Sequence, residues 1–103
     1  MKILLVAATH SELKPIQQKL EEVQIEHEIT CSVTGVGMIA TTFALTSKLR
    51  KNHFDLAINV GIAGAFDKRI YLGEVVEVVQ DKFSEELIED GDGFKTYQEV
   101  GLK

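Results

Sequence analysis

The chain has 103 residues, 45% of them hydrophobic and 26% charged, which is typical of one globular domain or of part of a larger one. Eleven basic against sixteen acidic residues give a net charge of -5, which offers no basic field to a phosphate backbone and makes nucleic acid an unexpected partner. The longest apolar run, residues 3–8, is far shorter than the roughly 20 residues that span a bilayer, so we expect no membrane association and a cytoplasmic location.

The first third of the chain predicts a strand, a helix and a second strand. Residues 2–8 form an apolar run too short for a helix, which is typical of a strand buried on both faces. From Leu13 onward, apolar residues recur at helical spacing, with polar residues between them. Residues 25–33 alternate apolar and polar side chains, which predicts a half-exposed or edge strand.

The middle of the chain repeats this alternation of helix and strand. Residues 38–50 carry an apolar side and end in basic residues, which favours a second helix. Residues 56–60 predict a short buried strand that runs directly into the glycine loop 61–64. Residues 75–79, after the turn residue Gly73, are β-branched and predict a further strand. This order of elements indicates an α/β sandwich with a mixed sheet.

The end of the chain predicts no regular sheet element. Residues 85–93 are rich in acids and glycine and predict a solvated loop, and residues 94–103 predict a loop with a short helical piece. A calcium loop built around Gly93 would place Ile88 at its first ligand position, and an isoleucine cannot ligate a cation. The single cysteine, Cys31, and three scattered histidines match no zinc spacing, so we expect no metal. The aromatic residues Phe43, Phe54 and Phe66 are expected in the core.

The segment from Gly35 to Ala40 fits the G-x-G-x-x-G/A pattern of dinucleotide-binding loops. Against this interpretation, Asp55 has the required separation but stands before its strand rather than after it. A simple strand-to-helix turn, or a loop whose backbone N–H groups face a small polar ligand, explains the same residues. These three alternatives remain open on the sequence alone.

Glu12 follows the first strand and is expected at the carboxyl edge of the sheet, where α/β proteins bind ligands. A carboxylate at this place can activate water. The alternative is a capping box, because Thr9-x-x-Glu12 fits the pattern S/T-x-x-E. Pro15 would then be the sixth helical residue, where a proline lacks a needed donor, and this favours a helix start nearer Ser11.

Four motifs in order resemble the amino-terminal half of the nucleoside phosphorylase and nucleosidase superfamily. They are residues 1–8 with Glu12 beyond them, residues 34–37, residues 58–65 and residues 72–76. The strongest resemblance is to futalosine hydrolases, with methylthioadenosine/S-adenosylhomocysteine nucleosidases as near relatives. It implies a three-layer αβα sandwich with a central mixed sheet, in which residues 1–103 are the amino-terminal part of a single nucleoside phosphorylase-like domain.

The resemblance also implies which residues form the site. Glu12 matches the catalytic glutamate that orients or deprotonates the attacking water. The residues that match substrate-binding positions are Ala8 and Thr9 at the ribose, Gly37 and Met38 beside the nucleophile, and Ile62, Ala63 and Gly64 under the nucleoside. Ile62 replaces a hydroxyl residue common in the methylthioadenosine enzymes. No arginine occurs in the first two loops to hold phosphate, so water is the expected nucleophile.

The implied activity is hydrolysis of the N-glycosidic bond of a purine nucleoside, futalosine of menaquinone biosynthesis first and methylthioadenosine or S-adenosylhomocysteine as the alternative. The family takes its general acid and its ribose-binding glutamate from a carboxyl-terminal half that is absent from these residues. We therefore expect the chain alone to be inactive. The resemblance further implies a homodimer and no cofactor. A non-catalytic dinucleotide-binding or oligomerising module is the alternative of another class.

Overall fold

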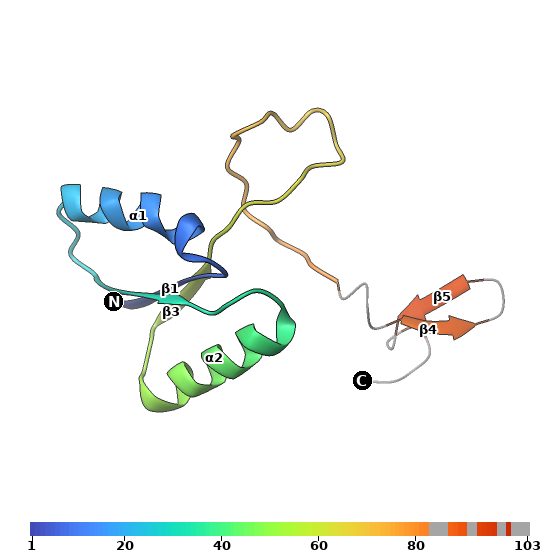
Figure 1. Cartoon of the computed structure of the whole chain (residues 1–103), viewed down its shortest axis with the longest axis horizontal. Coiled ribbons are helices and arrows are strands. Elements are labelled where there is room, and N and C mark those ends of the chain that lie inside the picture. Colours follow the sequence, from blue (N-terminus) through green and yellow to red (C-terminus); the bar gives the residue numbers. More distant parts are fainter. Residues whose placement is uncertain (83–86, 91–92, 97–98, 100–103) are drawn as a thin grey trace. The chain divides into compact units, whose positions relative to one another are not determined.

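A computed structural model describes residues 1–82, 87–90, 93–96 and 99 of the chain (Figure 1). The chain divides into two units, Met1–Phe66 and Asp67–Lys103, and each unit is described by itself. All residues predicted to form the site belong to the first unit.

The first unit is built on a parallel sheet of three strands. These are β1 (Lys2–Ala7), β2 (Glu28–Val33) and β3 (Leu56–Asn59), in the order β2-β1-β3. β1 lies in the centre and pairs along its whole length with β2 and over four residues with β3. The central place of β1 explains why the first apolar run is continuous, because both faces of a central parallel strand are covered. The predicted strands at 2–8, 25–33 and 56–60 are confirmed, with β2 shorter than expected.

Two helices cover the two faces of this sheet (Figure 1). Helix α1 (His10–Glu22) connects β1 to β2, and helix α2 (Met38–Lys51) connects β2 to β3. The first connection moves to one side of β1 and the second moves back past it, so right-handed crossovers place the helices on opposite faces. The α/β class and a helix on each face are therefore observed. The described sheet of this unit is purely parallel, and a complete sandwich with a mixed sheet stays a prediction.

Helix α1 begins earlier than the sequence indicated. Thr9 is its N-cap, and the Thr9 hydroxyl accepts a hydrogen bond from the backbone N–H of Glu12 at 3.3 Å. The expected start near Ser11 is wrong, because Thr9 caps the helix and its first residue is His10. Pro15 lies inside the helix. The proline lacks the N–H that would bond the carbonyl of Ser11, and Ser11 is an exposed residue of the helix. The cap outweighs this local loss.

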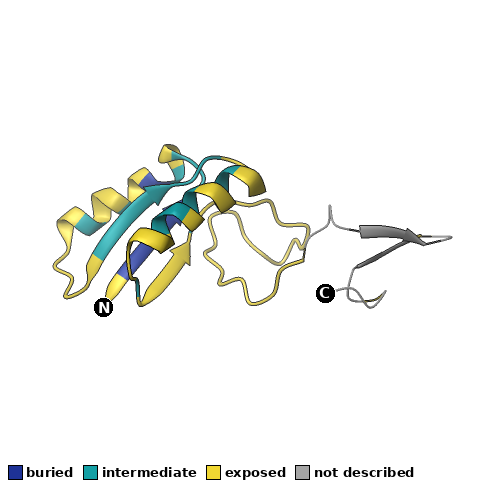
Figure 2. Ribbon diagram, turned by 90° about the horizontal axis from the view of Figure 1, so that it is seen from below, coloured by how far each residue is buried: buried dark blue, intermediate teal, exposed yellow. Residues whose placement is uncertain are grey.

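The core of the first unit lies between α1 and the sheet. Leu5, Ala7 and Leu13 are buried there, and six partly buried apolar residues pack around them: Ile16, Leu20, Ile29, Cys31, Val33 and Val60. Figure 2 shows the buried residues confined to β1 and to one turn of α1. The predicted stripe of α1 thus enters the core, and Cys31 packs there as a half-buried apolar side chain.

The opposite face and the outer strand are far more exposed than expected. No residue of α2 is buried, and all four residues of β3 are exposed. The prediction that the strand at 56–60 is buried is therefore wrong. The prediction that the aromatic residues lie in the core is wrong for two of the three phenylalanines. Phe43 is 77% and Phe66 105% exposed, whereas Phe54 is half-buried. Within the described residues β3 has a partner on one edge only, so its side chains lack the neighbours that a central strand would have.

The second unit also differs from expectation. Residues 75–79 form no strand, and Val75, Val76, Val78 and Val79 are exposed. A strand needs a hydrogen-bonded partner, and this run has none among the described residues. Instead, β4 (Leu87–Asp90) and β5 (Gly93–Thr96) form an antiparallel pair with Asp90 opposite Gly93. The predicted loop and helical piece are thus wrong over these eight residues, and the rest of residues 83–103, apart from Glu99, lies outside the described residues. The Asp-Gly repeat at 90–93 is the hairpin signal that was missed.

Across the described ranges, no helix has the length and apolar content needed to cross a bilayer.

The burial of Leu13 predicts the effect of truncating it. Leu13 lies on the side of α1 that faces the sheet and is 2% exposed. Leu13→Ala should therefore lower the free energy of unfolding by about 2–5 kcal/mol, because apolar burial is lost and a cavity is left. Leu49→Ala is the matched control, because Leu49 is 49% exposed on α2 and should change that free energy by less than about 0.5 kcal/mol. Urea denaturation of the whole chain followed by circular dichroism measures both. Equal losses in the two variants would contradict the core described above.

Candidate active site

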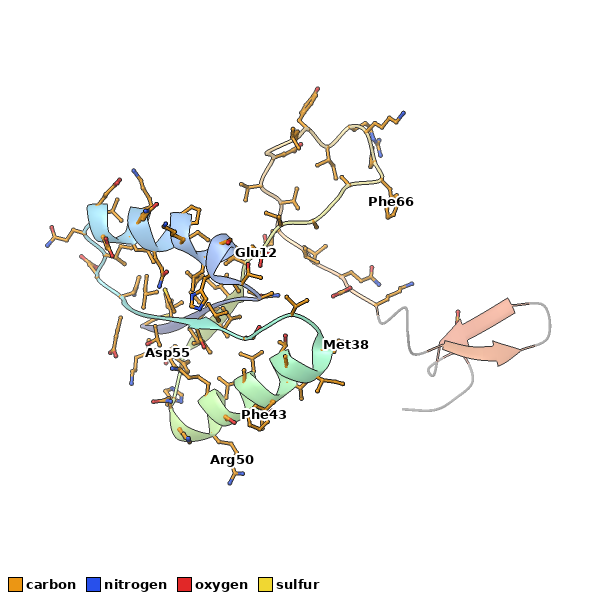
Figure 3. The ribbon with its side chains drawn as sticks, in the orientation of Figure 1. Glu12, Met38, Phe43, Arg50, Asp55 and Phe66 are labelled. Carbon is orange, nitrogen blue, oxygen red and sulfur yellow. The ribbon has the colours of Figure 1, made fainter. Side chains whose placement is uncertain are left out.

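The loops after the three parallel strands meet at one edge of the sheet, and they carry every residue predicted to form the site. The connection from β1 leads to β2 on one side of it, and the connection from β2 leads back to β3 on the other side. The winding of the sheet therefore reverses between β1 and β3. Ligands of open α/β sheets bind at the carboxyl ends of the strands at such a switch point. In Figure 3, Glu12 at the start of α1 and Met38 at the start of α2 lie at this end of the unit.

Glu12 joins the loops after β1 and β3. Its Oε2 accepts a hydrogen bond from the Thr9 hydroxyl at 2.7 Å, and its Oε1 accepts one from the backbone N–H of Ile62 at 3.2 Å. The side chain is half-buried. The carboxylate therefore lies against the glycine loop that follows β3 and does not point into open solvent.

The two hydrogen bonds also set the charge of Glu12. The Thr9 hydroxyl, and after it the Ile62 amide, hold the pKa of the Glu12 carboxyl below its ordinary value, because both bonds favour the ionised form. Glu12 is thus a carboxylate at neutral pH. A carboxylate accepts hydrogen bonds only, so it can orient a water molecule and stabilise nearby positive charge.

The capping interpretation of Thr9 and Glu12 is confirmed, and it does not exclude a role at the sheet edge. Thr9 caps α1 through the N–H of Glu12, while the Glu12 carboxylate extends to Ile62 in the neighbouring loop. The two interpretations were competing alternatives in the sequence. In the structure, the cap is what brings the carboxylate to this edge.

Gly61 is a residue of this contact that the sequence did not single out. A Cβ atom at Gly61 would lie 3.1 Å from Oε1 of Glu12, closer than ordinary van der Waals contact. The position immediately after a strand and before the turn was the available signal, since a glycine there permits close approach of another group. Glycine at 61 therefore leaves room for the carboxylate.

The glycine turn after β2 lies at the same edge but is not bonded to Glu12. Gly35 and Gly37 have φ values of +87° and +98°, which L side chains rarely adopt, so both positions favour glycine. Thr34 supports the turn: its N–H donates to the carbonyl of Ala7, and its hydroxyl to the carbonyl of Gly35. Gly37 is the N-cap of α2 without a side-chain cap, and Met38 is 48% exposed.

The other predicted site residues are placed as follows. Ala8 and Thr9 are half-buried at the end of β1, whereas Ala63 and Gly64 are exposed and make no hydrogen bond within the described part of the chain. The Ile62 side chain is 88% exposed, and its backbone N–H makes the contact with Glu12. The structure thus brings together Thr9, Glu12 and Ile62, and leaves the remaining positions around them without a mutual bond.

Asp55 lies at the opposite edge of the sheet, which argues against a dinucleotide site. Its Oδ2 accepts the backbone N–H of Lys2 at 2.7 Å, and its Oδ1 lies 3.3 Å from Nε2 of His53. The Lys2 amide, and after it His53, lower the pKa of the Asp55 carboxyl. Asp55, labelled in Figure 3, therefore bonds the start of β3 to the start of β1.

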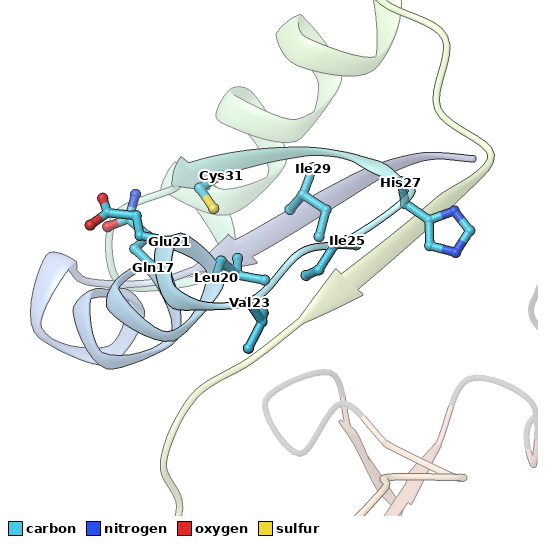
Figure 4. A pocket seen from close by; sticks show the side chains of 8 residues that line it. All are labelled: Gln17, Leu20, Glu21, Val23, Ile25, His27, Ile29 and Cys31. Carbon is cyan, nitrogen blue, oxygen red and sulfur yellow. The ribbon is translucent and has the colours of Figure 1, made fainter.

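A shallow groove runs between α1 and β2, away from Glu12. Leu20, Ile29 and Cys31 contribute its apolar floor, and Glu21 and His27 lie at its rim (Figure 4). It contains none of the residues predicted to form the site. Among the residues that the structure describes, no three His, Cys, Asp or Glu side chains are grouped as metal ligands would be.

The close approach of Gly61 predicts the effect of adding a methyl group there. Gly61→Ala should displace the flexible end of Glu12 and break its bond with the Ile62 N–H, because the new Cβ would lie 3.1 Å from Oε1. The amide signal of residue 62 in a ¹⁵N–¹H NMR spectrum should then shift upfield. Gly64→Ala is the matched control, since its Cβ would meet nothing within 4 Å. An unchanged signal in Gly61→Ala would show that the Glu12–Ile62 bond is not formed in solution.

Comparison with known proteins finds curated relatives with one recurring name. No family model and no solved structure matches the chain. The 5'-methylthioadenosine/S-adenosylhomocysteine nucleosidase of Maridesulfovibrio salexigens is 31% identical over 90 residues, and the proteins of that name from Bacillus cytotoxicus and Bacillus cereus strain B4264 are 27% identical. These alignments cover 74% of this chain and 39% of each relative, so the chain spans about two-fifths of the length of the curated relatives it matches. This weak similarity supports the resemblance to the nucleoside phosphorylase superfamily.

Proposed function

We propose that the chain supplies the water-activating part of a purine nucleosidase. The observation that carries the proposal is the Glu12 carboxylate, held at the carboxyl edge of the sheet by the Thr9 hydroxyl and by the Ile62 N–H. The names of the relatives support the same class of reaction, because they are nucleosidases. The alternative, a purely structural role in which Glu12 ties the start of α1 to the loop after β3, is tested below by Glu12→Gln.

The chemistry of N-glycosidic hydrolysis explains the use of such a carboxylate. The bond between ribose and purine breaks with positive charge developing on the sugar and negative charge on the base. Glu12 is ionised and aligned by two donors, so in this proposal it orients the attacking water and accepts its proton as the bond to the anomeric carbon forms. The backbone of Ala8 and Thr9 would line the ribose, with Gly37 and Met38 beside the water. The loop Ile62–Ala63–Gly64 would lie under the nucleoside.

Two nucleosides are the substrates to compare. The names of the relatives support methylthioadenosine or S-adenosylhomocysteine. The overall resemblance of the sequence favours futalosine. The ratio of kcat/KM values for methylthioadenosine and futalosine, measured as purine release by the nucleosidase that contains this chain, decides between them.

We further propose that the exposed face of α2 contacts a second copy of the chain. Ile39 is 90% exposed, and Phe43, labelled in Figure 3, is 77% exposed. At a spacing of four residues they share one face of α2. Adjacent large apolar side chains on a helix surface are typical of an interface. The dimer implied by the family resemblance provides an occupant for this face.

Replacing Glu12 tests the catalytic proposal. In the nucleosidase that contains this chain, Glu12→Gln should reduce kcat for purine release by the roughly 10²–10⁴-fold typical of a lost general base, with little change in nucleoside binding. Glu21→Gln, the same substitution on the exposed side of α1, is the matched control and should retain activity. A loss smaller than about tenfold in Glu12→Gln would leave Glu12 with a capping role only.

Sedimentation tests the proposed dimer. Phe43→Asp should convert dimers to monomers, because a charge on the apolar face of α2 would lose its water on association. Phe66→Asp is the control, since Phe66 is fully exposed outside α2. Sedimentation velocity at several protein concentrations measures both variants. A dimer that persists in Phe43→Asp would exclude this face as the contact.

A further inference from the structure

The proton of the Thr9 hydroxyl is not available to a substrate, although the sequence placed Thr9 among the substrate-binding residues. A hydroxyl has one proton to donate, and in Thr9 that proton goes to Oε2 of Glu12 at 2.7 Å. The same oxygen accepts the backbone N–H of Glu12 at 3.3 Å. Both its bonds therefore return to one residue.

We propose that Thr9 is the positioning residue of the site: its hydroxyl fixes the rotamer and the ionised state of the Glu12 carboxylate that orients the water. This inference rests on the proposed nucleosidase function for its catalytic consequence. Thr9 acts through Glu12 and need not touch the reacting atoms.

The geometry supports this role because the carboxylate is held at both oxygens from two directions. The Thr9 hydroxyl binds Oε2 from the end of β1, and the Ile62 N–H binds Oε1 from the loop after β3. Two donors on different oxygens fix the rotation of the carboxylate plane, which a single bond would leave free. The remaining lone pairs face outward and can accept a water molecule.

The arrangement also determines which protonation state is stable. The Ile62 N–H can only donate, and the Thr9 hydroxyl donates its proton to the ionised form, so both bonds as they stand favour the carboxylate. The Thr9 hydroxyl is the largest of the causes that lower the pKa of Glu12. Without it, the pKa of Glu12 should rise toward the ordinary value of a glutamate. The acidic limb of the rate profile would then move to higher pH, because only the ionised form orients the water.

The test uses three variants, two at Thr9 and one at a matched threonine. Thr9→Val keeps the shape of the side chain and removes the donor, Thr9→Ser keeps the donor, and Thr30→Val makes the same replacement on β2, away from Glu12. The first measurement is a ¹³C NMR titration of the Glu12 side-chain carboxyl in the whole chain. The pKa of Glu12 should rise in Thr9→Val and should stay low in Thr9→Ser and Thr30→Val.

The second measurement is purine release by the nucleosidase that contains this chain, over a range of pH. Thr9→Val should lower kcat by about 10–100-fold with KM little changed, and should move the acidic limb upward, as expected for a misplaced catalytic group. Thr9→Ser should restore both properties. A residue that only caps α1 would lower thermal stability and leave the acidic limb in place.

The two measurements separate this inference from the function on which it rests. An unchanged pKa of Glu12 in Thr9→Val overturns the positioning role, whatever the activity. If Glu12→Gln retains turnover, the proposed function fails, and the titration still decides whether Thr9 holds the carboxylate. A raised pKa together with an unmoved rate profile would also overturn the inference, because Glu12 would then not act through its ionised form.

Discussion

One carboxylate joins two loops that are 50 residues apart in the sequence, and the candidate site depends on this contact. Glu12 belongs to the first turn of α1, and Ile62 belongs to the loop after β3. The bond between them requires that α1 begins at Thr9, that β3 lies beside β1, and that residue 61 has no side chain. The cap and the glycine are local properties of the sequence, whereas the place of β3 beside β1 depends on the strand order, and together they put an ionised group at the edge of the sheet where the strands end.

The strand order makes this contact possible. Since β1 is central and β3 lies next to it, the loops that leave these strands are neighbours, while the loop after β2 lies on the other side of β1. This explains why Glu12 is bonded to the glycine loop 61–64 and not to the turn at Gly35–Gly37. The turn instead contributes the uncapped start of α2, whose free N–H groups face the same edge and favour a polar or anionic group.

Much of the first unit was predictable from the sequence, because its signals are local. The apolar run of β1, the stripe of α1 and the basic end of α2 each follow from periodicity or helix-end chemistry. Other features depend on partners that a sequence pattern does not identify. The valine run at 75–79 has strand-like composition, but a strand also needs a hydrogen-bonded neighbour. Burial of Phe43 and of β3 was overestimated for the same reason. Apolar character indicates that a residue tends to be covered, but it does not indicate which part of the protein covers it.

The candidate site was predictable in part. Position and chemistry singled out Glu12, and the T-x-x-E pattern singled out its cap. The pattern could not show that one side chain serves both purposes, because that depends on where the loop after β3 passes. Pro15 misled the helix start because its local cost was taken to argue against a cap at Thr9. Gly61 was missed because its importance is steric and arises only when Glu12 lies against it.

The central position of the first strand has a kinetic consequence. β1 precedes both of its pairing partners in the sequence, and the contact of Lys2 with Asp55 closes a chain segment of 53 residues. Non-local pairing of this kind slows folding, because the entropy of a long loop is lost before the contact forms. The first partner of β1 is β2, which ends at residue 33, whereas the second edge of β1 stays unpaired until β3 is complete at residue 59. Docking of α1, which follows β1 directly, would cover one face of this apolar strand while its second edge is still open.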